Sequence, residues 1–310
     1  MPNIQFGYIM PADRRHYSGQ ATFVADLNRA LDLVSGHFDS AWMVDHLQFG
    51  DAFLLESFTA LTYMAALHPR LKFGHTVLSQ SFRNPALLAK MAATLQFLSG
   101  GRFILGLGAG GHAEDYRAYG YDFPPNGVRV AQLEEAVQII QALWTQSPAT
   151  FAGQHYRIEQ AYCEPRPNPP PSLMVGAFKP KMLRLTARYA DGWNVSSTGL
   201  PQYRRLAADF DRACAAVGRD PSSVQRSWGG GCICAPTQAE AERLAGDLWG
   251  STDPEDNFDF VGTPRRIIEQ MRPFIDLGVN YFMLDCSPFP SLTTLELLVS
   301  EVLPALNQSQ

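Results

Sequence analysis

Residues 102–116 read RFILGLGAGGHAEDY, an apolar run that ends in closely spaced glycines and leads into charged residues. Gly106, Gly108 and Gly111 fit G-x-G-x-x-G, the fingerprint of dinucleotide-binding domains. In a Rossmann domain this motif opens the first strand–helix turn, and an acidic residue ends the next strand about 20 residues later. Here three strand–helix units precede the glycines, and no such acidic strand end follows. The glycines are therefore predicted to end the fourth strand of another fold, where bare backbone admits a planar cofactor or a phosphate; simple turning of the chain is the alternative.

Short apolar runs alternate with amphipathic segments along the whole chain. Nearly continuous apolar runs are typical of parallel strands that helices cover on both faces. Apolar residues recur at helical spacing in residues 21–34, 84–101 and 130–144. Eight alternations without a linker predict one domain over residues 1–310, an α/β fold of the (β/α)8 TIM-barrel type. The eight strands are expected at residues 4–10, 40–46, 71–78, 102–108, 172–178, 192–197, 225–235 and 281–286.

Three stretches are too long to be simple connections between a strand and a helix. Residues 110–127 and 147–171 come after the fourth strand, and residues 248–262 come after the seventh. Residues 150–159, within the second stretch, are predicted to form a small hairpin. Long loops in compact domains are commonly functional, and loops that follow barrel strands lie on the C-terminal rim, where active sites form. We therefore expect insertions after strands 4 and 7 to border the site.

Composition limits the classes of function. Hydrophobic residues make up 46% of the chain and the formal net charge is −5, so a large core is available and no nucleic-acid partner is expected. No apolar stretch is long enough for a transmembrane helix, and the N-terminus lacks the pattern of a signal peptide, so a cytoplasmic protein without a membrane partner is expected. The five cysteines are sparse and odd in number, which favours buried free thiols over a disulfide framework.

Acidic and imidazole side chains fall at the predicted ends of two strands. Asp45 and His46 close the second strand, and His75 and Thr76 lie near the end of the third. On the C-terminal rim, a carboxylate beside an imidazole can bind a cofactor and move a proton. The alternatives are an exposed strand end without a role for the first pair and a purely structural role for His75.

The fifth strand leads into GAFKPKMLRL, residues 176–185. Gly176 and Ala177 allow a ligand to approach the backbone closely, and a helix is expected to begin near Pro180. Free N–H groups at a helix start attract an anion, and Lys179 adds a positive charge. This segment is therefore the best predicted phosphate site, the alternative being lysines that are simply solvated at a helix start.

A metal hydrolase on the same barrel is a competing interpretation, because Asp45, His46, His75 and Asp285 all fall near strand ends. The sequence contains no H-E-x-x-H, no H-x-H on the first strand and no histidine at the ends of strands five to eight. A complete set of metal ligands is therefore hard to assemble, and no metal is predicted. The absence of G-x-S-x-G also argues against a serine hydrolase.

Several segments resemble one family. They are similar to the bacterial luciferase-like superfamily of flavin- and deazaflavin-dependent oxidoreductases, and two of them are closer to its F420-dependent branch. These two are FDSAWMVDHLQ (38–48) and RNPALLAKMAATLQFLSGGRFILGLGAG (83–110). The others are HYRIEQAYCEPRPNPPPSLMVGAFKPKMLRLTARYADGWN (155–194) and GTPRRIIEQMRPFIDLGVNYFML (262–284).

The resemblance implies a TIM-barrel subunit, usually part of a homodimer, that binds coenzyme F420 or, alternatively, FMN. In the F420-dependent branch, the residues that match Asp45 and His46 lie beside the deazaflavin. The segment that matches His75, Thr76 and Val77 forms a bulge behind the ring, often with a non-prolyl cis peptide bond. Further cofactor and phosphate contacts are implied at Gly106, Gly108, Ala109, Gly110, Gly176, Ala177, Phe178 and Lys179.

Two positions depart from the sugar-phosphate dehydrogenases of this branch. Gly111 stands where those enzymes carry a glutamate, and Phe49-Gly50 stands where they carry a tryptophan. A hexose phosphate is therefore not the expected substrate. The residues that can replace the missing acid are His112, Glu114 and Asp115.

The implied reaction is hydride transfer between F420 and a small organic substrate. His46 is expected to donate or accept the proton, with Asp45 as its partner or as a cofactor ligand. One alternative is an FMN-dependent monooxygenase that uses O2, and a partner flavin or F420 reductase would supply reduced cofactor. Another alternative is a redox-inert cofactor-binding protein. Because F420 is an obligate hydride carrier and reduced FMN reacts with O2, the identity of the cofactor separates the first two reactions.

Overall fold

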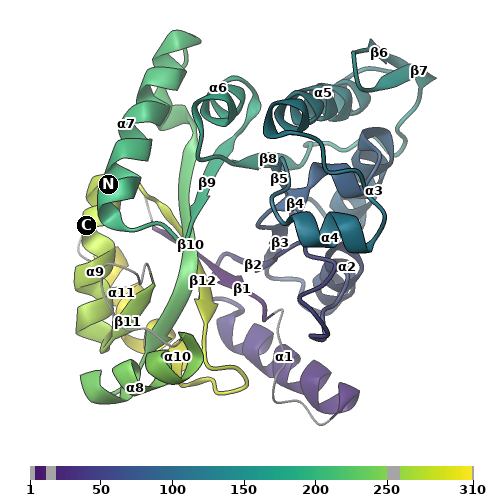
Figure 1. The fold of residues 1–310 in the computed structure, drawn as a ribbon. Helices are drawn as coiled ribbons and strands as arrows, with labels where there is room; N and C mark the ends of the chain where they lie inside the picture. Colours follow the sequence, from purple (N-terminus) through teal and green to yellow (C-terminus); the bar gives the residue numbers. More distant parts are fainter. Residues whose placement is uncertain (1–3, 12–18, 250–258, 309–310) are drawn as a thin grey trace.

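The computed structural model describes residues 4–11, 19–249 and 259–308. Eight parallel strands close into a ring in the order β1-β2-β3-β5-β8-β9-β10-β12, with β12 returning to β1 (Figure 1). The predicted (β/α)8 barrel is therefore confirmed, and the closed ring excludes the open sheet of a Rossmann domain. The ring strands are β1 (Gln5–Ile9), β2 (Ser40–Met43), β3 (Lys72–His75), β5 (Phe103–Gly108), β8 (Ser172–Gly176), β9 (Gly192–Ser196), β10 (Gln225–Cys234) and β12 (Tyr281–Cys286).

Helices cover the outside of the ring (Figure 1). Their starts follow local chemistry, since Asn84 caps the helix that begins at Pro85 and Thr263 caps the helix that begins at Pro264. Among the described residues, no helix combines the length and the hydrophobicity needed to cross a bilayer. The helices are α1 (Gln20–Val34), α2 (Ser57–Leu67), α3 (Pro85–Leu98), α4 (Ala113–Ala118), α5 (Asn126–Thr145), α6 (Pro180–Tyr189), α7 (Leu200–Ala216), α8 (Gln238–Trp249), α9 (Pro264–Asp276), α10 (Thr293–Leu297) and α11 (Leu303–Gln308), with a short 3-10 turn, η1 (Gln80–Phe82).

Alternate residues along the barrel strands belong to two separate clusters of buried side chains. Side chains from β2, β5, β8 and β12 form one buried cluster, which includes Trp42, Ile104 and Met283. Their neighbours in sequence, such as Ala41 and Leu105, pack with the helices in the main core. Because successive strand residues point to opposite faces, the first cluster fills the interior of the barrel. The C-terminal rim is consequently the part of the barrel that can open to a ligand.

The hairpin predicted at residues 150–159 is confirmed, as the antiparallel strands β6 (Ala149–Ala152) and β7 (Arg157–Ala161). It projects beyond α5 at the edge of the molecule (Figure 1). The Glu135 carboxylate of α5 accepts hydrogen bonds of 2.8–2.9 Å from three backbone N–H groups in residues 154–156. The Tyr156 hydroxyl also donates to Gln80 Oε1 of η1 at 3.1 Å. The insertion is thus attached both to a helix and to the loop that follows β3.

Two sequence predictions need correction. The strand expected at residues 71–78 is divided, because β3 ends at His75 and a short strand, β4 (Leu78–Ser79), then pairs with β5. The insertion expected at residues 248–262 falls largely outside the described residues, but its last part forms β11 (Phe260–Gly262), which pairs with β10. Both strands are only two or three residues long, so neither contains the apolar run that predicts a barrel strand from the sequence.

The turn between β3 and β4 packs tightly against bare backbone. Its Thr76–Val77 peptide bond is cis, as the family resemblance implied. A Cβ at Gly108 would lie 2.7 Å from Val77 Cγ2, and a Cβ at Gly106 would overlap the His75 carbonyl oxygen. The prediction that these glycines admit a cofactor is therefore corrected for Gly106, whose free space is occupied by the protein's own turn.

The substitution Gly106→Ala tests this packing. Because its methyl group would meet the backbone of β3, we expect the free energy of unfolding to fall by about 1–3 kcal/mol, the usual cost of overpacking. Gly246→Ala is the matched control, since Gly246 lies inside α8 with open space around it, and alanine there is expected to stabilise by about 0.5–1 kcal/mol. Urea denaturation measures both values, and an unchanged midpoint for Gly106→Ala would contradict the packing.

Candidate active site

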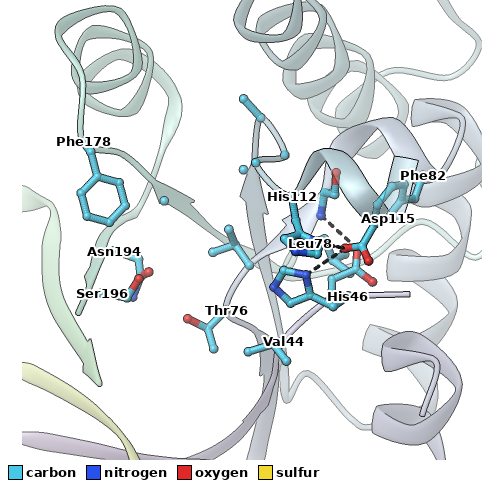
Figure 2. A pocket seen from close by; sticks show the side chains of 18 of the residues that line it. Val44, His46, Thr76, Leu78, Phe82, His112, Asp115, Phe178, Asn194 and Ser196 are labelled. Atoms are coloured by element: carbon cyan, nitrogen blue, oxygen red, sulfur yellow. Dashed lines mark hydrogen bonds and ion pairs between the residues drawn. The ribbon is translucent and has the colours of Figure 1, made fainter. Parts of the chain in front are cut away.

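A pocket of about 490 Å³ opens at the C-terminal ends of five neighbouring strands, β2, β3, β5, β8 and β9 (Figure 2). This is the rim where barrel sites form, and the volume is typical of a small-molecule site. The lining residues are Val44, Asp45, His46, Thr76, Val77, Leu78, Ser79, Phe82, Gly108, Ala109, Gly110, Gly111, His112, Asp115, Tyr116, Gly176, Phe178, Lys179, Met182, Asn194 and Ser196. Most of the residues predicted from the sequence are thus brought together, whereas His75, Gly106 and Ala177 do not line the pocket.

The His46 imidazole is held by a carboxylate from another loop. Its Nδ1 lies 2.9 Å from Asp115 Oδ2, and the second oxygen, Oδ1, accepts a hydrogen bond of 3.2 Å from the Gln48 backbone N–H. Asp115 is buried at the start of α4, whereas the His46 side chain stays about one-third exposed. A carboxylate accepts hydrogen bonds, so the neutral imidazole tautomer that fits this contact carries its proton on Nδ1 and its lone pair on Nε2.

A second imidazole approaches the same carboxylate oxygen. His112 Nδ1 lies 3.4 Å from Asp115 Oδ2, and the two imidazole rings are 5.4 Å apart and nearly perpendicular. The Phe49 ring contacts both, at centroid distances of 4.4 Å and 5.5 Å. His112 Nδ1 is buried and makes no hydrogen bond with any of the described residues. The sequence named His112 and Asp115 as substitutes for the acid missing at Gly111, but only the structure places them beside His46.

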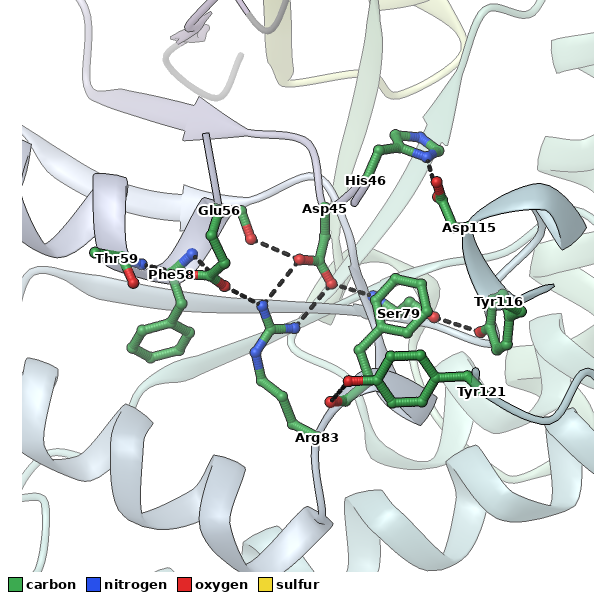
Figure 3. Close-up of polar contacts among 12 residues, drawn as sticks. Asp45, His46, Glu56, Phe58, Thr59, Ser79, Arg83, Asp115, Tyr116 and Tyr121 are labelled. Carbon is green, nitrogen blue, oxygen red and sulfur yellow. Dashed lines mark hydrogen bonds and ion pairs between the residues drawn. The ribbon is translucent and has the colours of Figure 1, made fainter. Parts of the chain in front are cut away.

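Asp45 belongs to a different network from His46 (Figure 3). Its two oxygens accept from Arg83 Nη1 and Nη2 at 2.9 Å and 3.0 Å, from the Ser57 hydroxyl at 2.6 Å, and from the Ser79 backbone N–H at 2.9 Å. The expectation that Asp45 is the partner of His46 is therefore corrected, because these bonds occupy Asp45 while His46 is bound by Asp115. Asp45 instead ties the end of β2 to the turn after β3 and to α2.

Arg83 joins Asp45 to Glu56, the residue that caps α2. Burial opposes the ionisation of Glu56, but hydrogen bonds from Thr59 and Arg83 prevail and lower its pKa to about 2. Burial likewise opposes the charge on Arg83, yet its hydrogen bonds to the two carboxylates raise its pKa. Glu56 and Arg83 are consequently charged at neutral pH, and their contacts with each other and with Asp45 hold this part of the rim together.

The predicted role of His75 in the cofactor site is corrected as well. Its fully buried ring stacks on Phe58 of α2 at 5.2 Å and meets Phe103 of β5 at 5.8 Å. Burial lowers the pKa of His75 to about 4, so the ring is neutral at pH 7. The side chain packs between strand and helix, away from the pocket, whereas its neighbours Thr76 and Val77 line the pocket.

The predicted anion site forms the opposite wall. Helix α6 begins at Pro180 as expected, and the exposed Lys179 precedes it without making a side-chain capping bond. Free N–H groups in the first turn are therefore available to an anion. Gly176 and Phe178 line the pocket here, and Figure 2 shows Phe178 across the pocket from His46. Ala177 is buried, and its carbonyl oxygen accepts from Trp193 Nε1 at 2.9 Å, so its predicted contact with cofactor is corrected.

Sequence reasoning missed several lining residues. Asn194 and Ser196 come from β9, and Ser79 and Tyr116 are linked by a hydrogen bond of 2.5 Å between their hydroxyl groups. Strand alternation in the segment GWNVSS (192–197) places Asn194 and Ser196 on the same face, so this signal was present in the sequence. The sequence contains no such signal for Tyr116, because the position of this residue depends on how the segment after β5 folds back.

The metal-ligand set considered from the sequence is not assembled. Asp45 is paired with Arg83, His75 is buried elsewhere, and Asp285 at the end of β12 does not line the pocket. A different group does converge: ligand atoms of His46, His112 and Asp115 all lie within 4.8 Å of one another.

The rim of the closed barrel therefore carries an imidazole–carboxylate pair and, across the pocket, a helix start that attracts anions. Residues 4–260 match the luciferase-like monooxygenase family, and the chain belongs to this family of enzymes.

Relatives and solved structures agree with this assignment. A protein of Intrasporangium calvum named F420-dependent glucose-6-phosphate dehydrogenase is 29% identical over 303 residues, which cover 87% of this chain and 90% of that protein. An F420-dependent secondary alcohol dehydrogenase, solved with an F420-acetone adduct, superimposes with a TM-score of 0.82 at 20% identity and covers 96% of this chain and 98% of its own. A monooxygenase from Streptomyces bottropensis gives a TM-score of 0.83 at 19% identity, covering 98% of this chain and all (100%) of its own. A dehydrogenase and a monooxygenase thus share this fold, so the fold does not distinguish between the two reactions.

Arg83→Leu tests the network that holds Asp45. Because it leaves a buried carboxylate without its ion pair, we expect the free energy of unfolding to fall by about 3–5 kcal/mol. Arg157→Leu is the control, since its ion pair with Glu159 is exposed and contributes about 0–1 kcal/mol. Chemical denaturation measures both, and equal losses in the two variants would contradict a dominant role for Arg83.

Proposed function

We propose that this protein is an F420-dependent oxidoreductase that transfers a hydride between coenzyme F420 and a small organic substrate. The main support is the geometry of His46 at the rim of the pocket, where Asp115 holds Nδ1 and no hydrogen bond links Nε2 to another described residue. Relatives named as F420-dependent dehydrogenases match almost the whole chain, which favours this cofactor over FMN. When bound, F420 accepts or supplies the hydride.

The residues of the pocket fit such a cofactor. Residues 108–111 line one wall. A Cβ at Gly108 would meet Val77 and one at Gly110 would meet Tyr116, but a Cβ at Gly111 would meet no atom within 4 Å, so open space adjoins Gly111. Val77 lies at the base of the pocket beside these glycines. Lys179 and the first turn of α6 can hold a phosphate group of the cofactor. Apolar side chains, including Leu78 and Met182, limit the access of water to the reacting region.

His46 is the residue that we assign to proton transfer. Its Nε2 can take a proton from a substrate hydroxyl during oxidation or return it during reduction. The Asp115 carboxylate stabilises the imidazolium that forms and keeps the ring in one orientation. Asp45 has no free position for this task, because four hydrogen bonds already occupy its oxygens.

The proposed substrate class is an uncharged alcohol or its carbonyl product. Gly111 and Phe49 replace the acid and the aromatic residue that sugar-phosphate dehydrogenases of this branch carry. Among the described lining residues, Lys179 is the one lysine or arginine side chain, and we assign it to the phosphate of the cofactor. A phosphorylated substrate would compete for the same charge.

Cofactor titration with wild type and His46→Ala tests this function. We expect F420 fluorescence to be quenched at one equivalent by both proteins, and FMN to bind neither at the same concentration. With a panel of secondary alcohols and glucose 6-phosphate, His46→Ala should lose about 10²–10⁴-fold in turnover, the usual contribution of a general acid or base.

His155→Ala serves as the control, because His155 lies in the β6–β7 insertion and does not line the pocket. Unchanged turnover in His46→Ala would remove His46 from the mechanism. Stoichiometric FMN binding with oxygen consumption would favour the monooxygenase, which then requires a partner reductase. F420 binding without turnover on any substrate would favour a redox-inert carrier.

We propose a cytoplasmic location. All five cysteines are buried free thiols, as the sequence predicted. Unpaired thiols are typical of a reducing compartment.

We further propose that the protein forms a homodimer through α2 and α3. Large apolar side chains are exposed on both helices, among them Tyr63 and Leu67 on α2 and Phe97 and Leu98 on α3, the last with 70% of its surface exposed. The two helices also share a groove lined by Ala65, Ala66, Leu95 and Leu98. Contiguous exposed apolar surface of this kind marks a protein interface.

Light scattering tests the dimer. Wild type should have twice the 34.3 kDa mass of one chain, and Leu98→Asp should reduce this to a single chain because it places a charge in the apolar face. Tyr162→Asp is the control, since Tyr162 is equally exposed but lies near the hairpin. A monomeric wild type, or a dimeric Leu98→Asp, would contradict this interface.

A further inference from the structure

We propose that His46, His112 and Asp115 form a binding site for one divalent transition-metal ion, and that an ion bound there inhibits the enzyme. The binding part is independent of the reaction, whereas the inhibition rests on the proposed function.

The geometry of the three side chains supports this site. Asp115 Oδ2 lies 2.9 Å from His46 Nδ1 and 3.4 Å from His112 Nδ1, and all three ligand atoms fall within 4.8 Å of one another. Ligands about 2.0–2.2 Å from a tetrahedral zinc ion are about 3.3–3.6 Å from each other. The His112–Asp115 distance already matches this value, whereas the other two separations must change, each by up to about 1 Å. Small rotations of the two imidazole side chains would therefore bring the three atoms to coordinating distance of one ion.

An unsatisfied polar atom points to the same place. His112 Nδ1 is buried, yet it has no hydrogen-bond partner within the described part of the chain. Buried polar atoms are ordinarily satisfied. This nitrogen lies 3.4 Å from Asp115 Oδ2 without forming a hydrogen bond to it, so its hydrogen-bonding capacity is unused. A metal ion at the centre of the cluster would satisfy it. Figure 2 shows both imidazoles and the carboxylate directed toward one another at the edge of the pocket.

The ligand types select the class of metal. Two imidazole nitrogens and one carboxylate suit Zn²⁺, Co²⁺ or Fe²⁺ rather than Mg²⁺ or Ca²⁺, which prefer oxygen ligands. Asp115 is already oriented for the task, because the Gln48 backbone N–H holds its other oxygen. With three protein ligands, at least one coordination position would remain open toward the pocket.

Metal binding would change what His46 can do. In the imidazole–carboxylate pair, Nδ1 carries the proton and Nε2 can accept another from the substrate. A metal ion takes the lone pair of Nδ1, so the proton of the neutral ring moves to Nε2. The pocket-facing nitrogen then becomes a donor and can no longer act as a base. Metal binding and proton acceptance at His46 therefore exclude one another.

Direct binding measurements test the site. Zn²⁺ titrated by calorimetry into the untagged chain should bind with a stoichiometry of one, and Co²⁺ should give the visible absorption of a tetrahedral nitrogen–oxygen site. His112→Ala and Asp115→Asn should each weaken binding by about 100-fold or more, because losing even an outer-shell partner costs about 10–100-fold. His155→Ala is the matched control and should bind as wild type does.

Inhibition is measured as the ratio of rates with and without Zn²⁺ in each protein, so that any effect of a variant on its own rate cancels. The ratio should fall for wild type and for His155→Ala, and stay close to one for His112→Ala. Weak binding that is equal in all variants, or tight binding that survives His112→Ala, would overturn the site. Tight binding without inhibition would overturn the proposed consequence and leave His46 without its role as the base.

Discussion

The pocket depends on a close contact between one turn and bare backbone. The chain between β3 and β4 presses Val77 against Gly108 and Gly176 and brings the His75 carbonyl against Gly106. Side chains at these positions would force the turn outward, toward the space that the pocket occupies. Because glycine offers no Cβ, the strands can approach the turn closely and still close the ring. The same contact fixes where Thr76 and Val77 line the rim.

Two carboxylates on this rim have separate tasks. Asp45 is bound by Arg83, Ser57 and a backbone N–H, so it stabilises the scaffold. Asp115 is equally buried, but its partners are imidazoles that face the pocket. The two carboxylates differ in the residues that they bind rather than in how deeply they are buried. One holds the scaffold together, and the other orients the imidazoles at the pocket.

The sequence contained most of the fold. Apolar runs and helical spacing identified all eight strands of the ring. The site was only partly predictable, because chain adjacency suggested that Asp45 and His46 act together. Their side chains diverge, and Asp115, the partner of His46, lies 69 positions later at the start of the short helix α4. Contacts of that kind are set by tertiary packing, which a single sequence does not display.

The attachment of the β6–β7 insertion has a consequence for how enzymes of this shape diversify. A single tyrosine hydroxyl of the hairpin reaches η1 at Gln80, and Phe82 two residues later forms part of the pocket wall. A peripheral segment is thereby connected to a wall of the pocket without lining the pocket itself. Changes in the length or composition of the hairpin can reposition η1 and Phe82. The eight strands of the barrel need not change.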